Sequence, residues 1–426
     1  MPIRVHSEIG SLKRVLLHRP GKAIDWMAPS RMERLLFDDI LDSGKAREEH
    51  ELFWRLLEKA GAEVLDTEDL LSDVFQDSEI RGAACEELAR NFGMTPHRQE
   101  DLAAVPPEEL AAIFVRGLRV QGDIGVGKAR RFFDLDPLPN FFFQRDPQVV
   151  VGEHVVISAM ATAAREREPY LSKLAFSHHP VLAGAKDVFQ IESPSFWAPE
   201  FELEYPYPRL EGGDVLIANE ETLLIGLSAR TNFQGAILVA EYLRSQKTSF
   251  RHLLMVQLPA KRSYMHLDTV FTFIDRGTCL AFLPVCEPGG AESTRPFLVD
   301  LGADSLSLSP RSSLQEALAE VGIEVELVPC GGSEDLIDQQ REQWTDGANA
   351  FAMAPGVIAL YRRNRRTVEE LARRGWRALD CEEALDDAVD LIGQGPTVIT
   401  LLDHELSRAR GGPRCMTMPL ERDPLP

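Results

Sequence analysis

The sequence contains little cysteine: 6 residues in 426, at positions 85, 279, 286, 330, 381 and 415. No two of them form a C-x-x-C pair, which argues against a disulfide framework and against a zinc or redox site. No run of about 18 residues is free of charge, and the first residues lack the apolar segment of a signal peptide. We therefore predict a cytoplasmic protein with no membrane association.

Basic residues are scarce relative to acidic ones. The chain has 46 Lys and Arg against 67 Asp and Glu, a net charge of −21 at pH 7. Such a chain repels polyanions, so we expect no nucleic-acid partner, although solubility alone accounts for an acidic composition. The histidines show no zinc-ligand spacing, H-E-x-x-H is absent and no segment matches a P-loop, so no metal or organic cofactor is predicted.

Several segments repeat one pattern, in which two β-rich runs flank a short turn and precede an amphipathic helical stretch. At 215–218 and 223–225 the runs flank Asn219-Glu220-Glu221, and the helical stretch follows at 234–244. Similar runs occupy 12–17, 149–157, 270–283 and 350–361, with helical stretches near 45–60, 165–174 and 367–374. Units that each bury only part of their apolar surface pack around a common centre, which predicts an α/β fold built from repeats.

Residues 67–132 break this pattern, because their apolar residues recur at helical spacing. Within them, Pro106-Pro107-Glu108-Glu109 resembles a helix start. We predict an all-helical insertion at 67–132 within a main α/β domain formed by residues 1–66 and 133–426.

A candidate nucleophile lies near the end of the chain, in Arg410-Gly411-Gly412-Pro413-Arg414-Cys415. The glycines permit close backbone approach, and the two arginines would favour a thiolate, whose ordinary pKa is about 8.5. The alternative is a buried cysteine that acts only as a small hydrophobe. The loop indicates a thiol directed at a cationic substrate.

Two upstream motifs carry groups that such a thiol needs. Alternation from 264 to 274 predicts a strand with His266 and Asp268 on one face, where the histidine can act as general acid and base. In Glu211-Gly212-Gly213-Asp214 the glycines predict a tight bend, and the paired acids suit the orientation of a histidine or a cation. Each motif alone also fits an ordinary polar pair or turn.

A third motif, NFFFQRDP at 140–147, places three aromatic residues beside Asp146. A planar guanidinium stacks on rings and pairs with carboxylates, so it fits such a place. Core packing of the aromatics is the alternative. The three motifs and the cysteine loop together point to a guanidinium substrate.

PNFFFQRDP, EGGD, HLDT and RGGPRCM, in this order and over nearly the whole chain, resemble the arginine deiminases of the guanidine-modifying superfamily. The resemblance implies a five-bladed α/β propeller, the pentein fold, made of pseudo-fivefold ββαβ repeats with the helical insertion. It also implies hydrolysis of L-arginine to L-citrulline and ammonia in arginine catabolism, without a cofactor.

The resemblance assigns catalytic roles to five residues: Cys415, His266, Glu211, Asp146 and Asp268. Cys415 would attack the guanidinium carbon and form an amidino-cysteine intermediate, while the two aspartates hold the guanidinium nitrogens. His266 would protonate the departing ammonia and then activate water, with Glu211 positioning it.

The residues that the resemblance assigns to substrate binding are Asn140, Phe143, Arg165, Arg230, Arg410 and Asp214. Asn140, Arg165 and Arg230 match positions that bind the α-carboxylate, and Arg410 matches an arginine of a mobile loop. Asp214 would chiefly support its own loop. The chain departs from the family at Gln144, commonly Thr, and at Ala409, often Gly.

Other guanidine enzymes are alternatives: agmatine deiminase, dimethylarginine hydrolase or an amidinotransferase. Agmatine has no carboxylate, so Arg165 and Arg230 argue against it. An amidinotransferase differs only in using an amine where a hydrolase uses water. A non-catalytic arginine-binding protein fits the five reactive residues less well, and a homo-oligomer is left open.

Overall fold

The computed structural model describes residues 1–91, 96–120, 132–192, 207–290 and 292–425. In these ranges one topology recurs: two antiparallel strands form a pair, and a chain segment containing a helix leads to a further strand parallel to one of them. Two sheets illustrate it. The first consists of β5 (Gln148–Val151), β6 (His154–Ile157) and β7 (Asp187–Gln190), with α7 (Arg167–His178) between β6 and β7. The second begins with β8 (Val215–Asn219), β9 (Thr222–Leu227) and β10 (His252–Gln257), with α8 (Phe233–Ser245) between β9 and β10. The second sheet is extended by β13 (Arg295–Asp300) and β14 (Ser309–Pro310).

Two further sheets follow the same order. One consists of β11 (Phe271–Asp275), β12 (Thr278–Ala281) and β15 (Glu326–Pro329), with α9 (Leu283–Cys286) and α10 (Leu314–Glu320) between β12 and β15. The other follows α11 (Leu336–Trp344) and consists of β16 (Phe351–Ala354), β17 (Val357–Tyr361), β18 (Arg377–Asp380) and β19 (Thr397–Leu401). Helix α12 (Arg365–Arg373) lies between β17 and β18 in the chain, and α13 (Cys381–Ala384) between β18 and β19. The hairpins predicted near 149–157, 215–225, 270–283 and 350–361 are therefore confirmed.

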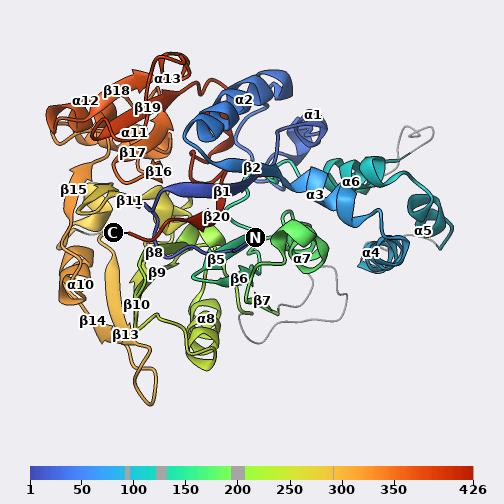
Figure 1. Ribbon diagram of the computed structural model, residues 1–426, viewed down its shortest axis with the longest axis horizontal. Helices are drawn as coiled ribbons and strands as arrows, with labels where there is room; N and C mark the ends of the chain where they lie inside the picture. The colour runs from blue at the N-terminus through green and yellow to red at the C-terminus, as the bar shows by residue number, and fades with distance from the viewer. Residues whose placement is uncertain (92–95, 121–131, 193–206, 291, 426) are drawn as a thin grey trace.

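The remaining sheet of this kind joins the two ends of the chain. Strand β1 (Leu12–Leu17) runs parallel to β2 (Glu63–Asp66) through α2 (Ser43–Lys59) and antiparallel to β20 (Met418–Arg422). Helices α2, α7, α8, α10 and α12 lie around the outside, whereas β1, β5, β8, β11 and β16 lie toward the middle of the molecule (Figure 1). Loops that leave the inner strands can therefore meet near the centre.

Local chemistry explains these elements. Every residue of β5, β6 and β17 is buried, which is why these strands are nearly uninterrupted apolar runs. Gly152, with φ of 61°, makes the turn between β5 and β6, a backbone conformation that favours glycine. Helix α2 begins after Asp42, whose carboxylate accepts a hydrogen bond from the Lys45 N–H.

Within 67–132 the described elements are mostly helical: α3 (Thr67–Val74), α4 (Ser78–Asn91), α5 (Pro96–Ala103) and α6 (Pro107–Arg116), followed by β3 (Leu118–Arg119), which pairs with β4 (Phe133–Leu135). These helices lie together on one side of the molecule (Figure 1). Leu71, Leu88 and Phe114 share one hydrophobic cluster with Val150 of β5. The segment thus packs through a common core on the neighbouring sheet.

The segment around His266 differs from the prediction. The expected strand over 264–274 is wrong before Phe271, because Arg262–Tyr264 and Leu267–Thr269 form short 3₁₀ turns. His266 itself is extended, and Asp214 Oδ1 accepts the Leu267 N–H at 2.8 Å, which holds the turn that follows. The alternation of polar and apolar residues here therefore accompanies a buried turn and does not mark a strand.

The described chain includes the short helix α1 (Lys22–Asp25) and 3₁₀ turns at Pro29–Arg31, Pro180–Leu182, Gly212–Asp214 and Leu406–Ala409. No helix among the described residues has the length and apolar character needed to cross a membrane.

Candidate active site

Cys415 lies between the Leu406–Ala409 turn and β20, and it is buried. Its loop is fixed on both sides: the Tyr361 hydroxyl donates to the Gly411 carbonyl at 2.7 Å, and the Arg145 N–H donates to the Cys415 carbonyl at 3.0 Å. A Cβ on Gly411 would lie 2.4 Å from the Phe143 ring. The aromatic motif and the cysteine loop are therefore packed directly against each other, and glycine is needed for the approach.

The thiol faces carboxylates. Cys415 Sγ lies 3.9 Å from Asp268 Oδ2. Burial raises the pKa of this thiol well above its ordinary value, Asp268, Asp146 and Asp346 raise it further, and a hydrogen bond from the Gly412 backbone opposes them. The expectation that Arg410 and Arg414 favour a thiolate stays a prediction, because burial and the nearby acids set the direction of this pKa.

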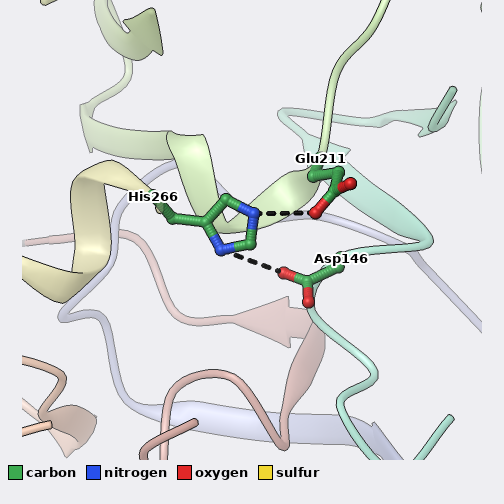
Figure 2. Close-up of side chains that lie close together, drawn as sticks. All are labelled: Asp146, Glu211 and His266. Atoms are coloured by element: carbon green, nitrogen blue, oxygen red, sulfur yellow. Dashed lines mark hydrogen bonds and ion pairs between the residues drawn. The ribbon is translucent and has the colours of Figure 1, made fainter. Parts of the chain in front are cut away.

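The histidine sits between two acids (Figure 2). His266 Nε2 lies 2.8 Å from Glu211 Oε2, and Nδ1 lies 3.7 Å from Asp146 Oδ1. Burial lowers the pKa of His266, but Asp146 and the hydrogen bond to Glu211 outweigh it and raise the pKa to about 9. Near neutral pH the imidazole is therefore protonated and can donate a proton.

The glycines of the EGGD bend are required by crowding. A Cβ on Gly212 would lie 2.0 Å from the Arg145 carbonyl oxygen, and one on Gly213 would lie 2.5 Å from His266 Nδ1. The bend therefore has no room for a side chain at Gly212 or Gly213, where its backbone lies against the other two motifs. The close approach predicted for this bend is confirmed.

The two aspartates are held by arginines through one oxygen each. Asp146 Oδ2 pairs with Arg165 Nη1 at 2.5 Å, and Asp268 Oδ2 pairs with Arg414 Nη1 at 2.8 Å. The Oδ1 atoms of both aspartates are buried and have no hydrogen-bond partner among the described residues. Two fixed carboxylate oxygens therefore lack a hydrogen bond, although Asp146 Oδ1 faces His266 Nδ1, and both can accept from a cation.

Asp214 supports the histidine segment. Besides the Leu267 N–H it accepts the Ser228 hydroxyl at 2.6 Å. Burial raises the pKa of Asp214 to about 7. These contacts are consistent with the supporting role that the family resemblance implies for Asp214.

Arg165 and Arg230 have different surroundings. Arg165 makes a two-pronged pair with Glu168 in addition to Asp146, and its Nη2 donates to the Phe143 carbonyl at 3.3 Å. Arg230 is largely buried, and its Nη1 lies 3.9 Å from Glu211 Oε1 and makes no hydrogen bond in the described ranges. A carboxylate would therefore find an unused donor at Arg230, whereas Arg165 already holds Asp146 in place.

The other predicted substrate residues are Asn140, Phe143 and Arg410, of which Phe143 lies against the cysteine loop and Arg410 belongs to it. Asn140 donates to the Leu35 carbonyl at 2.8 Å, and Phe143 packs on Phe142 with ring centroids 4.1 Å apart. The Arg410 guanidinium lies 3.3 Å from the centre of the Trp344 ring, on a backbone with φ of 67°. Binding roles for these three residues stay predictions.

The two departures from the family have visible environments. Gln144 is buried, accepts the Thr67 hydroxyl at 2.7 Å and donates to the Phe141 carbonyl at 2.6 Å. It therefore links the aromatic motif to the start of α3. Ala409 is buried at the end of the Leu406–Ala409 turn.

Sequence reasoning missed Glu8 and Asn349. Glu8 Oε1 and Oε2 accept Arg414 Nη2 and Nε, each at 3.0 Å, so Glu8 ties the N-terminal segment to the residue before the thiol. Asn349 contacts the cysteine loop from the residues before β16. Neither residue lies in a motif or a periodic pattern that would have pointed to it.

Asp146, Glu211 and His266 offer ligand atoms within 4.8 Å of one another, as a metal site would. Two features disfavour a metal there. Arg165 and Arg230 already place positive charge beside the acids, and a metal ligand histidine must be neutral, whereas the pKa of His266 is raised. The arrangement suits proton transfer beside an organic cation better.

Comparison with known proteins identifies the family. The arginine deiminase family model matches residues 33–109 and 123–422. The arginine deiminase of Bacillus cereus (strain ATCC 10987 / NRS 248) is 35% identical over 439 residues, covering 99% of this chain and 98% of that protein. That of Listeria innocua is 33% identical, with 99% of each chain covered.

Solved structures share the fold at low sequence identity. SxtG, an amidinotransferase from Microseira wollei, aligns with a TM-score of 0.55 at 13% identity, covering 100% of this chain and 98% of that one. The N-terminal domain of ArgZ, with a covalently bound reaction intermediate, aligns with a TM-score of 0.51 at 16% identity, covering 97% and 99%. The family match spans nearly the whole chain and the relatives align from end to end, so this protein belongs to the arginine deiminase family.

Proposed function

We propose that the protein hydrolyses L-arginine to L-citrulline and ammonia through a covalent amidino-cysteine intermediate, as a step of arginine catabolism. The observation that carries the proposal is the meeting, in one buried site, of a thiol, a histidine between two acids, and two aspartates that each have one oxygen without a hydrogen bond. Such a site fits a planar cation whose central carbon is to be attacked.

The guanidinium binds first, between Asp146 Oδ1 and Asp268 Oδ1. Its positive charge offsets the carboxylates that raise the pKa of Cys415, so the thiol loses its proton to solvent when substrate is present. The thiolate forms only beside the carbon that it attacks. This arrangement limits side reactions of the free enzyme.

The thiolate then adds to the guanidinium carbon. His266, protonated on the ring, gives a proton to the nitrogen that leaves as ammonia, and the carbon remains bonded to sulfur as a cationic amidino group. Glu211 holds the imidazolium by the 2.8 Å hydrogen bond at Nε2. Fixed carboxylates stabilise the positive charge throughout this step.

Water completes the reaction. Neutral His266 takes a proton from water, the hydroxide adds to the amidino carbon, and the carbon–sulfur bond breaks to return the thiolate. The hydroxyl proton leaves as the carbonyl of citrulline forms. The residues suffice for both steps, so the proposal includes no metal or organic cofactor.

The α-carboxylate of arginine binds Arg230, whose Nη1 makes no hydrogen bond in the described ranges. Asn140 and Phe143 line the substrate, Arg410 closes over it and Arg165 acts mainly through Asp146. Agmatine has no carboxylate and would leave the Arg230 Nη1 donor without a hydrogen bond.

The fold proposal is a five-bladed α/β propeller around this site. The recurring sheet topology supports it, and so does the origin of the site residues in loops between different sheets. The main domain comprises 1–66 and 133–426, with 67–132 inserted. The six cysteines are all free thiols, which supports a place in the reducing cytoplasm.

The test is to measure citrulline and ammonia from L-arginine with wild-type protein and with Cys415→Ala. Citrulline formation should be lost in the variant, and quenched wild-type enzyme should carry the amidino mass on Cys415. Adding an amine acceptor should not divert the product. Diversion would instead identify an amidinotransferase, and arginine binding without ammonia release would identify a binding protein.

A further inference from the structure

We propose that Asn349 is a positioning residue for the reaction: its side-chain amide clamps the cysteine loop to the Asp268 turn and thereby sets where the sulfur meets the substrate carbon. The inference rests on the proposed function and extends it to a residue outside the reactive groups.

The contacts of Asn349 join two parts of the site. Its Oδ1 accepts the Arg414 N–H at 3.1 Å and the Cys415 N–H at 3.3 Å, while its Nδ2 donates to the Asp268 carbonyl at 3.1 Å. One amide thus holds the backbone of the nucleophile and the backbone of the aspartate that faces it. The side chain is fully buried, so water does not compete for these bonds.

Asparagine suits this position better than a similar side chain. The two N–H groups need an acceptor and the carbonyl needs a donor, and an amide offers both within one rigid plane. Aspartate has the same shape, but it cannot donate to the Asp268 carbonyl and would add a charge beside the thiol. Serine is too short to span both partners.

Asn349 also fixes the loop through Gly412. A Cβ on Gly412 would lie 2.6 Å from Asn349 Oδ1, so the loop backbone rests directly on the amide. The Gly412 backbone hydrogen-bonds the sulfur and favours the thiolate. Removing the amide therefore frees the segment that carries both the sulfur and the N–H that stabilises it.

Asn349 is itself well anchored. Its N–H donates to the Asp346 carbonyl at 3.0 Å, and the chain enters β16 two residues later. A rigid strand thus supports the clamp, whereas the cysteine lies in a loop. Positioning by a well-supported neighbour matters because a misplacement of about 1 Å costs roughly 100-fold in rate.

The experiment compares Asn349→Ala and Asn349→Asp with Asn364→Ala. Asn364 is a matched control, because it is also fully buried and bonds Thr345 through both Oδ1 and Nδ2, whereas its side chain makes no hydrogen bond to the cysteine loop among the described residues. The readouts are kcat and KM for arginine, thermal stability, and the pH dependence of Cys415 alkylation by iodoacetamide, located by peptide mass.

For Asn349→Ala, we expect kcat to fall about 10- to 100-fold with KM changed by less than about threefold. The pH of half-maximal alkylation should rise by about one unit, and further in Asn349→Asp, where the new carboxylate joins Asp268, Asp146 and Asp346 around the thiol. Asn364→Ala should lower stability as much while leaving the alkylation profile unchanged.

The proposal is overturned if the Asn349 variants alkylate with the wild-type pH profile, or if they lose no more kcat than Asn364→Ala. Alkylation needs no substrate, so it also tests the clamp independently of turnover. If wild-type protein released no ammonia from arginine, the proposed function would fail while the alkylation result still decided the role of Asn349. If Asn349→Ala does not fold, Asn349→Asp, which keeps the shape of the side chain, decides the role of Asn349.

Discussion

Replacing Glu8 with glutamine tests whether the ion pair behind the cysteine loop stabilises the protein. Glu8 makes two hydrogen bonds of 3.0 Å to Arg414, and both side chains are buried. Burial alone would raise the pKa of Glu8, but Arg414 and Arg145 outweigh it and lower the pKa from 4.5 to about 2. Since one pKa unit corresponds to about 1.4 kcal/mol, the carboxylate contributes about 3 kcal/mol to folding at pH 7.

The sign of the pH dependence follows from the lowered pKa. The contribution of Glu8 is fully present above the unfolded pKa of about 4.5, and it is lost as pH falls through about 2. Glu8→Gln should therefore unfold with a free energy about 3 kcal/mol lower at pH 7, and the difference should shrink to roughly half at pH 3. The value agrees with the cost of about 3–5 kcal/mol for breaking one side of a buried pair.

The assay is urea unfolding of wild-type protein and of Glu8→Gln at pH 7 and pH 3, with Glu221→Gln as control. Glu221 pairs with Arg251 at 3.3 Å, but both side chains are more than half exposed, so its loss should cost under about 1 kcal/mol. A difference below about 1 kcal/mol for Glu8→Gln at pH 7, or one that is equal at the two pH values, would refute the reasoning.

Three other changes probe the reactive groups. Because the pKa of His266 is raised to about 9, kcat should fall as pH rises through about 9, and a fall in kcat already complete at pH 7.5 contradicts this. The stability that the charge of His266 adds should be complete below about pH 6.5 and should be lost as pH rises through about 9. Gly213→Ala should lower kcat by about 100-fold, since its methyl group would lie 2.5 Å from His266 Nδ1, whereas Gly82→Ala, with open space around it, should keep wild-type kcat. Arg230→Ala should raise KM for arginine by about 10- to 100-fold without a similar effect on agmatine turnover, and an equal effect on both substrates would remove Arg230 from the carboxylate site.

The hairpins were predictable because β-rich runs on either side of a turn are a local signal. At 215–218 and 223–225 the predicted runs fall within β8 and β9, and glycine marks the turn between β5 and β6. The tight bend of EGGD was predictable for the same reason, since two adjacent glycines restrict what the chain does there. Local sequence signals thus predicted the hairpins and the tight bend at which the motifs meet.

The details of the site depend on contacts that no local pattern encodes. Alternation at 264–274 predicts a strand, whereas a hydrogen bond from the Leu267 N–H to distant Asp214 stabilises a turn. Similarly, Arg414 lies beside the thiol in the sequence, but Glu8 and Asp268 hold its guanidinium. Partners far apart in sequence decided these outcomes, and only the folded chain brings them together.

The pairing of β1 with β20 has a consequence for how the enzyme is made. Cys415 lies three residues before β20, and Leu12 of β1 is opposite Arg422. During translation, β1 cannot pair with its antiparallel partner β20 until almost all of the described chain has been synthesised. Pairing of strands so far apart in sequence is slow and entropically costly. We therefore expect that a nascent or prematurely terminated polypeptide without β20 lacks a fixed position for the thiol and has no activity on arginine.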